Sequence, residues 1–204
     1  MNSNKQSIRQ DFKIISDWIK PESEMLDLGC ADGSLLRYLQ DTKQVHGYGL
    51  EREAENIAKC ISNKINVIQR NLNDGLPNFA DKSFDYVVLS LTLQSIKRAS
   101  VLIDEMLRVG EEAIVSFPNF GHWSIRFQLA FGGKMPVSKR LPFEWYNTPN
   151  IRLCTVHDFE SFCANKNINI LESCVLNSDY QTTQLQTLFP NLFGNIAIYR
   201  ISRN

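Results

Sequence analysis

The sequence has no net charge, no long apolar run and no apolar segment near its start. Its 204 residues include 22 Lys and Arg and 22 Asp and Glu, so no summed field draws the chain onto nucleic acid or anionic lipid. No stretch approaches the roughly 20 uninterrupted apolar residues of a membrane span. Residues 1–13 are polar and lack the apolar core of a secretory signal. We therefore expect a cytoplasmic protein whose primary partner is neither nucleic acid nor a membrane.

Closely spaced cysteines are also missing. The five cysteines are odd in number and form no C-x-x-C pair, so the sequence suggests neither a disulfide framework nor a zinc knuckle. We expect reduced, mostly buried thiols and no metal site. With 43% hydrophobic and 22% charged residues, the composition is typical of a folded globular protein rather than a disordered one.

Predicted strands and helices alternate along the chain, as they do in a parallel sheet with crossover helices. An N-terminal helix is indicated by apolar residues at helical spacing, namely Ile8, Phe12, Ile15 and Ile19. Strands are predicted at 25–28, 45–50, 65–69, 84–90 and 113–117, helices at 34–40, 54–61 and 100–109, and β-rich segments at 168–176 and 195–201. A capping box at Thr155 and Asp158 predicts one more helix, to about residue 166. We expect one α/β domain spanning residues 1–204, with an insertion at about 120–154.

The turn after the first strand is the place to look for a ligand, because open parallel sheets bind ligands outside the carboxyl ends of their strands. Residues 27–33 have the sequence Asp-Leu-Gly-Cys-Ala-Asp-Gly. A dinucleotide fingerprint would require glycine at positions 31 and 34, where this chain has Ala31 and Ser34. The spacing therefore excludes an NAD site of that type.

Asp27 and the G-x-A-x-G turn resemble motif I of class I S-adenosylmethionine (SAM) methyltransferases. The resemblance implies a Rossmann-like fold with a central, mostly parallel seven-stranded sheet flanked by helices. It implies that Gly29, Ala31 and Gly33 let the backbone pass close to the methionine end of SAM, and that Asp27 holds the turn and the ligand's amino group. Ala31 stands where the family usually has glycine. The alternative is a glycine turn that only lets a helix pack closely on a strand.

Further ligand-binding residues are expected at the ends of the next strands. Glu51 follows Gly29 by 22 residues, and an acid near that separation binds ribose hydroxyls in nucleoside-binding α/β proteins; the alternative is a solvated charge at a strand end. The methyltransferase resemblance places Asn71 and Leu72 at adenine, where the Asn71 carbonyl oxygen can accept from the exocyclic amine. It also places Ser90 near the amino-acid end of SAM or of its demethylated product, S-adenosylhomocysteine (SAH); the alternative is a serine that only ends the strand.

No methyl acceptor is indicated by the loop that follows the fourth strand. Residues 90–95, Ser-Leu-Thr-Leu-Gln-Ser, lack the Asn-Pro-Pro-Tyr motif of amino-group methylases and offer no Cys, Lys or carboxylate. We assign Gln94 of this loop to the substrate or partner side of the site. His122 is the one general-base candidate nearby, and a structural histidine beside Trp123 is the alternative.

The insertion is rich in aromatic residues. Residues 117–146 hold eight aromatic side chains and four Lys or Arg against one acid, and aromatic residues with Arg are enriched in interface cores. Trp123, Phe127 and Phe131 are spaced i, i+4, i+8 on a short predicted helix that is apolar on most sides. The helix must pack on the body of the protein, act as a lid or contact another subunit. We expect Trp123, Trp145 and Tyr146 to contact a substrate or partner.

Three segments carry a more specific resemblance. Ser-Phe-Pro-Asn-Phe-Gly-His-Trp at 116–123, Phe-Gly-Gly-Lys-Met-Pro at 131–136 and Phe-Glu-Trp-Tyr-Asn-Thr-Pro-Asn-Ile at 143–151 resemble signature segments of the MetW family. The resemblance covers roughly residues 20–175. It implies a bacterial methionine-biosynthesis protein that binds SAM and supports the activity of homoserine O-acyltransferase (MetX).

Two hypotheses remain open at this point. In the first, the protein docks on MetX through the insertion and uses SAM as a structural or sensory ligand, since SAM is made from methionine. Such sensing requires that the docked and free states differ in their affinity for SAM. In the second, the protein is a SAM-dependent methyltransferase acting on an unidentified small molecule or protein. The sequence favours the first, because cofactor-binding residues are evident and acceptor chemistry is not.

Overall fold

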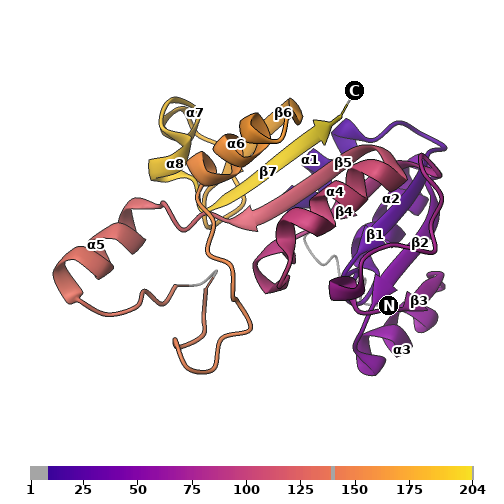
Figure 1. Cartoon of the computed structure of the whole chain (residues 1–204), viewed down its shortest axis with the longest axis horizontal. Coiled ribbons are helices and arrows are strands. Elements are labelled where there is room, and N and C mark those ends of the chain that lie inside the picture. Colours follow the sequence, from indigo (N-terminus) through magenta and orange to yellow (C-terminus); the bar gives the residue numbers. More distant parts are fainter. Residues whose placement is uncertain (1–8, 139–140, 204) are drawn as a thin grey trace, which may run out of the picture.

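The computed structural model describes residues 9–138 and 141–203. A seven-stranded sheet in the order β3-β2-β1-β4-β5-β7-β6 runs through the described chain (Figure 1). Six strands are parallel, and β7 is antiparallel to both of its neighbours. This architecture confirms the predicted mostly parallel seven-stranded sheet. The strands are β1 (Glu24–Leu28), β2 (His46–Glu51), β3 (Val67–Gln69), β4 (Phe84–Leu89), β5 (Gly110–Pro118), β6 (Asn169–Leu176) and β7 (Ile196–Ser202).

Helices cover both faces of the sheet, because the central strands are apolar on both sides. Met25, Leu26 and Leu28 of β1 are all fully buried. One core cluster lies under α1 (Gln10–Trp18), α2 (Ser34–Lys43) and α3 (Ala54–Ser62). The other lies under α4 (Ala99–Val109) and α6 (Val156–Asn165).

The local sequence signals account for most of these boundaries. The Thr155 side chain accepts from the Asp158 amide and the Asp158 side chain accepts from the Thr155 amide, so the predicted capping box begins α6. Ile8, which was expected in the first helix, lies outside the described residues. Four short elements had no prediction: η1 (Leu72–Asp74), η2 (Leu93–Ser95), α7 (Gln184–Leu188) and α8 (Pro190–Phe193).

The insertion leaves the body of the protein after β5, as predicted. Its two ends are joined, because Asn119 bridges Cys154 and the Phe120 amide donates to the Cys154 carbonyl at 2.9 Å. Between them, α5 (Trp123–Gly132) stands away from the sheet (Figure 1). Ile125 is the one residue of α5 that is buried. The helix therefore does not pack into the core of this chain.

No helix in the described ranges is long and apolar enough to cross a membrane. That the chain is a single domain stays a prediction.

Candidate functional site

A cavity of about 290 Å³ lies at the carboxyl ends of β1 to β4. The strand order reverses between β1 and β4, and such switch points are where open α/β sheets bind ligands. The cavity is therefore at the place that the sequence indicated. Its lining is Gly29, Ala31, Leu50, Glu51, Arg52, Glu53, Arg70, Asn71, Leu72, Asn73, Thr92, Ser95 and Ile96.

The turn after β1 has three residues with positive φ: Gly29 at +69°, Ala31 at +50° and Gly33 at +75°. A Cβ added at Gly33 would lie 3.0 Å from Ile65 and 3.2 Å from the Cys60 sulfur, so this glycine lets the turn pack closely on α3 and on the segment before β3. Gly29 and Ala31 line the cavity. Ala31 adopts a conformation that costs a non-glycine residue roughly 1–2 kcal/mol.

Glu51 is a buried carboxylate, 8% exposed, at the end of β2. Its Oε2 accepts from the Ala31 amide at 3.0 Å, and its Oε1 accepts from the amides of Arg52 and Glu53 at 2.7 and 2.9 Å. Glu51 is therefore not a solvated strand-end charge. A carboxylate has about four acceptor positions, so one position on Oε2 stays available to a ligand hydroxyl.

Asn71 and Leu72 line the cavity as expected, but the Asn71 side chain is oriented differently from the prediction. Its Oδ1 accepts from the Asn73 amide at 3.1 Å and from the Asn73 side-chain nitrogen at 3.0 Å, which caps η1. Both lone pairs of that oxygen are used. The side-chain nitrogen of Asn71 makes no hydrogen bond within the described residues, so Asn71 offers a ligand a donor and not an acceptor.

Asp27 is 2% exposed, and no described N–H or O–H group donates to its carboxylate. Burial is the main cause that raises its pKa to about 7; the Glu51 carboxylate raises it further, and the Arg9 guanidinium opposes both. A buried carboxylate without donors is stabilised by a cation. Among the described residues the cavity lining does not include Asp27, Gly33 or Ser90. The cavity is thus lined by the residues predicted to contact the nucleoside, Glu51, Asn71 and Leu72 among them, and we name it the nucleoside cavity after that prediction.

Thr92 is a site residue that sequence reasoning missed. A Cβ added at Gly29 would lie 2.8 Å from Thr92 Cγ2, so the Thr92 side chain lies directly against the glycine turn. Thr92 Oγ1 donates to the Ser90 carbonyl at 2.9 Å. The residue types of this loop indicate neither a nucleophile nor a base, and the contact of Thr92 with the glycine turn arises only in the folded chain.

His122 belongs to a different part of the molecule. It is 8% exposed, caps α5 through the Ser124 amide, and has its Nδ1 2.8 Å from the Ser124 hydroxyl. Burial lowers its pKa, so the ring is neutral at pH 7. It lines a second cavity of about 390 Å³ beside Trp123 and Gln186, and it is absent from the lining of the nucleoside cavity. A catalytic role for His122 stays an untested prediction.

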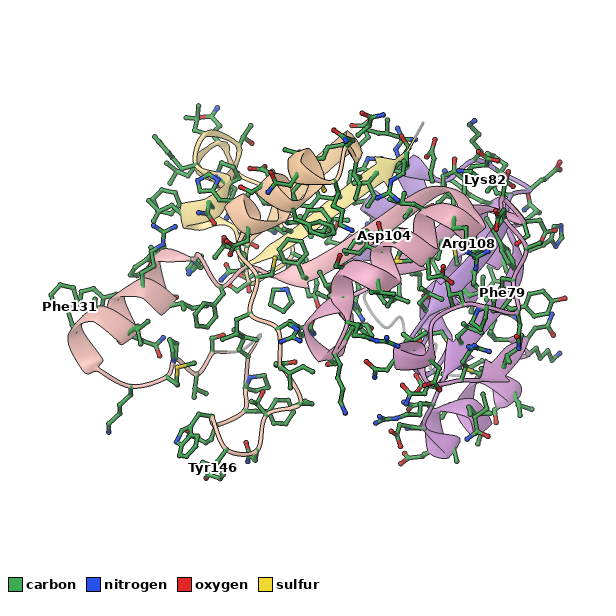
Figure 2. All side chains as sticks on the ribbon, viewed as in Figure 1. Phe79, Lys82, Asp104, Arg108, Phe131 and Tyr146 are labelled. Carbon is green, nitrogen blue, oxygen red and sulfur yellow. The ribbon has the colours of Figure 1, made fainter. Side chains whose placement is uncertain are left out.

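The aromatic residues of the insertion are on the surface. Trp123, Trp145 and Tyr146 are 50, 72 and 70% exposed. Phe131 lies at the outer end of α5 and Tyr146 at the tip of the following loop, both far from the sheet (Figure 2). None of the four lines the nucleoside cavity. The structure therefore separates the predicted cofactor residues from the predicted partner residues.

Gln94 links the loop after β4, which lies beside the nucleoside cavity, to the insertion. Its backbone carbonyl, in the loop after β4, accepts from the amides of Ile151 and Arg152 at 2.8 and 2.9 Å. The Arg152 side chain donates to the Lys97 carbonyl at 2.6 Å. The loop that carries Thr92 is therefore attached to the last residues of the insertion.

Comparison with solved structures defines the class of protein. The chain superimposes on a SAM-dependent methyltransferase from Mesorhizobium loti with a TM-score of 0.69 and 15% identity, covering 95% of this chain and 98% of that one. A SAM-dependent methyltransferase from Archaeoglobus fulgidus gives 0.68 and 14%, with 96% and 93% covered. The [4+2]-cyclase SpnF gives 0.68 and 14%, with 99% and 84% covered. The chain thus has the Rossmann-like class I methyltransferase fold.

Comparison of the sequence with protein families identifies the family to which the chain belongs. The family model of methionine biosynthesis protein MetW matches residues 9–201, and the chain belongs to this family, which is associated with methionine biosynthesis. The bifunctional methionine biosynthesis protein MetXA/MetW of Rhodopirellula baltica is 34% identical over 206 residues, 97% of this chain and 33% of the relative. The chain therefore spans about a third of the length of that curated relative.

Proposed function

We propose that the protein binds SAM or SAH and acts as a regulatory partner of the homoserine acyltransferase MetX. The observation that carries the proposal is the combination of a nucleoside-type cavity around buried Glu51 with a separate, exposed aromatic insertion. The relative from Rhodopirellula baltica supports it, because its name joins MetXA and MetW in one chain. Proteins that act together are often found fused in this way.

The residues at the switch point fit SAM. Glu51 offers an acceptor to a ribose hydroxyl, Asn71 offers a donor to an adenine ring nitrogen, and Leu72 supplies apolar surface. Asp27 is a buried carboxylate without a donor, which suits the ammonium of an amino-acid group. When bound, SAM would bring a methyl sulfonium, and these residues would hold and orient it.

The insertion fits a protein partner. Its exposed side chains include two tryptophans, a tyrosine and the phenylalanines of α5, the residue types enriched at interface centres. Exposed apolar residues that gather on one segment mark interaction sites in soluble proteins. Because Ile125 is the one buried residue of α5, a partner subunit would cover the other apolar side chains of this helix.

The loop after β4 would couple the two sites. Thr92 touches the glycine turn, and two residues further on the Gln94 carbonyl holds Ile151 and Arg152. A ligand in the cavity would contact Thr92, which lines it, and a shift of this loop would reach the end of the insertion. SAM would then act on MetX by differing in affinity for the docked and free states, since a ligand equally bound in both shifts nothing.

The alternative function is a SAM-dependent methyltransferase, and the observation that favours it is the fold. A methyltransferase needs an acceptor placed in line with the sulfonium. His122, the general-base candidate, lines the second cavity and not the nucleoside cavity. The partner hypothesis is therefore preferred.

Two measurements test the preferred function. Calorimetry with SAM and with SAH should give one binding site per chain, and size-exclusion chromatography should show co-elution with purified MetX. If neither SAM nor SAH gives a heat of binding, the proposal that the protein binds these ligands is refuted. Separate elution at micromolar concentrations of both proteins, with and without SAM, would refute the partner half.

A further inference from the structure

The second cavity, of about 390 Å³, lies between the insertion and the body of the protein. The insertion lines one side of it with His122, Trp123, Ser124 and Ser138, and the connection from β6 to β7 lines the other side. Among the described residues, none lines both this cavity and the nucleoside cavity. The proposed function therefore makes no use of this second cavity.

His122 offers an N–H group to the cavity. Its Nδ1 accepts from the Ser124 amide at 3.3 Å, and its ring is neutral because burial lowers its pKa, so the hydrogen is on Nε2. Nε2 makes no hydrogen bond to any described residue. The side chain is 8% exposed, yet Nε2 is not among the described polar atoms that lack both a partner and solvent contact. It is thus a donor that a ligand in the cavity can reach.

Two side chains on the opposite side also have donors to give and no acceptor. Gln186 is 6% exposed, its oxygen accepts from the Thr183 amide at 2.7 Å, and its nitrogen donates to a backbone carbonyl of α8 at 3.3 Å. An amide nitrogen has two hydrogens, so one remains. The Asn177 oxygen accepts from two backbone amides of its own loop at 2.9 and 2.8 Å, which leaves its nitrogen as the free group.

The rest of the lining is apolar or hydroxylic. Trp123, Leu185 and Phe193 supply apolar surface. The part of the lining that the structure describes contains no Asp, Glu, Lys or Arg, so a charged group bound here would lack a partner of opposite charge. N–H donors, apolar walls and no charge are complementary to a neutral molecule that carries an oxygen acceptor and an apolar part.

We propose that this cavity is a second ligand site, which binds a small uncharged molecule through a carbonyl oxygen. The carbonyl accepts from His122 Nε2 and from the free N–H of Gln186, and the apolar part of the ligand lies on Trp123. The site goes beyond the proposed function, because it requires neither SAM nor MetX. A ligand bound here contacts both sides of the cavity and so holds the base of the insertion against the body of the protein.

An NMR titration with isovaleramide tests the site, because this probe has one carbonyl group and a short apolar chain. It should give saturable shifts of the Trp123 indole and the His122 ring, with a Kd of about 1 mM, as is usual for so small a ligand. Isopentylamine has the same carbon skeleton without the carbonyl, and isovalerate has it with a charge. Both should bind more weakly than the amide.

Two substitutions remove the donors and keep the local structure. His122→Asn removes Nε2 and retains an N-cap for α5, because asparagine caps helices well. It should weaken isovaleramide binding about three- to tenfold, the effect of losing one uncharged hydrogen bond. Gln186→Glu removes the N–H donors and retains the capping box of α7, and should weaken binding at least as much. Gln184→Glu is the matched control on the exposed surface of α7 and should change nothing.

Three results would overturn the proposal. The first is no saturable shift of the Trp123 indole with isovaleramide up to about 100 mM, far above the expected Kd. The second is binding of isopentylamine or isovalerate as tight as that of the amide. The third is unchanged affinity in both His122→Asn and Gln186→Glu. Thermal unfolding checks that each variant is folded, and Gln186→Glu decides the matter if His122→Asn is not.

Discussion

At the scale of single residues, the site depends on charges and backbone angles that the sequence indicates only in part. Asp27 and Glu51 could be predicted, because motif spacing placed them at strand ends. The orientation of Asn71 could not, since its oxygen is taken by a cap of η1 that depends on Asn73. The role of Thr92 could not be predicted either, because it comes from a contact with Gly29, which lies far away in the sequence.

The titration of Asp27 leads to a prediction at this scale. Its pKa is raised to about 7 by burial and by the Glu51 carboxylate, so below pH 7 the carboxyl is mostly protonated and pairs weakly with an ammonium. We expect the affinity for SAH to rise as the pH goes from about 5.5 to 7.5, with little change for 5′-methylthioadenosine, a ligand that has the same nucleoside and no amino acid. Calorimetry across that range measures both, and Asp27→Asn should remove the dependence. An affinity for SAH that is independent of pH in the wild type would contradict this assignment.

Ala31 carries a second prediction. At φ +50° the alanine costs roughly 1–2 kcal/mol, while glycine costs about 0.5–1 kcal/mol through chain entropy. Ala31→Gly should therefore raise the free energy of unfolding by up to about 1.5 kcal/mol. Urea denaturation measures this, and Ala58→Gly, in the middle of α3 and exposed, should lower it by about 0.8–1 kcal/mol. If Ala31→Gly lowers the free energy of unfolding as Ala58→Gly does, then the backbone at Ala31 is not strained.

At the scale of elements, periodicity and caps predicted the strands and long helices, while the shortest elements escaped. Helices α7 and α8 have five and four residues, too few for a periodic pattern to be recognised. For α5 the pattern predicted the helix but not what covers it. A helix that is apolar on most sides fits a core or an interface equally, and the exposure of its aromatic residues is a property of the folded molecule.

The attachment of the loop after β4 to the insertion is testable with Arg152→Ala, which removes the bond to the Lys97 carbonyl. Binding of SAM to the isolated protein should stay within about twofold, because Arg152 does not line the cavity. The effect of SAM on acyl transfer by MetX should shrink. Acyl-transfer rates measured with and without SAM check this against Arg37→Ala, on the exposed face of α2, and an undiminished SAM effect would show that the coupling runs elsewhere.

Separate sites for nucleoside and partner predict opposite effects of two substitutions. Trp145→Ala removes an exposed aromatic side chain of the insertion and should weaken MetX binding at least about tenfold without changing SAM binding. Glu51→Ala removes the carboxylate of the cavity and should do the reverse. Calorimetry with each ligand measures both, with Ile61→Ala, an exposed apolar residue of α3, as the control. Identical effects of both substitutions would contradict separate sites.

At the scale of the whole molecule, the fold places the nucleoside cavity and the base of the insertion on one edge of the sheet. The cavity follows the carboxyl ends of β1 to β4, and the insertion follows the carboxyl end of β5, the next strand. Alternation of strands and helices was enough to predict the parallel strands whose carboxyl ends form this edge. The partner MetX could be proposed only from the segments that resemble the MetW family, because an exposed surface does not by itself identify the protein that binds to it.

The most direct test follows acyl transfer by MetX and formation of SAH in the same reaction, with this protein added at increasing SAM. Our account predicts that the protein raises the acyl-transfer rate, that the increase depends on SAM, and that no SAH forms. Accumulation of SAH while the acyl-transfer rate stays at that of MetX alone would contradict it.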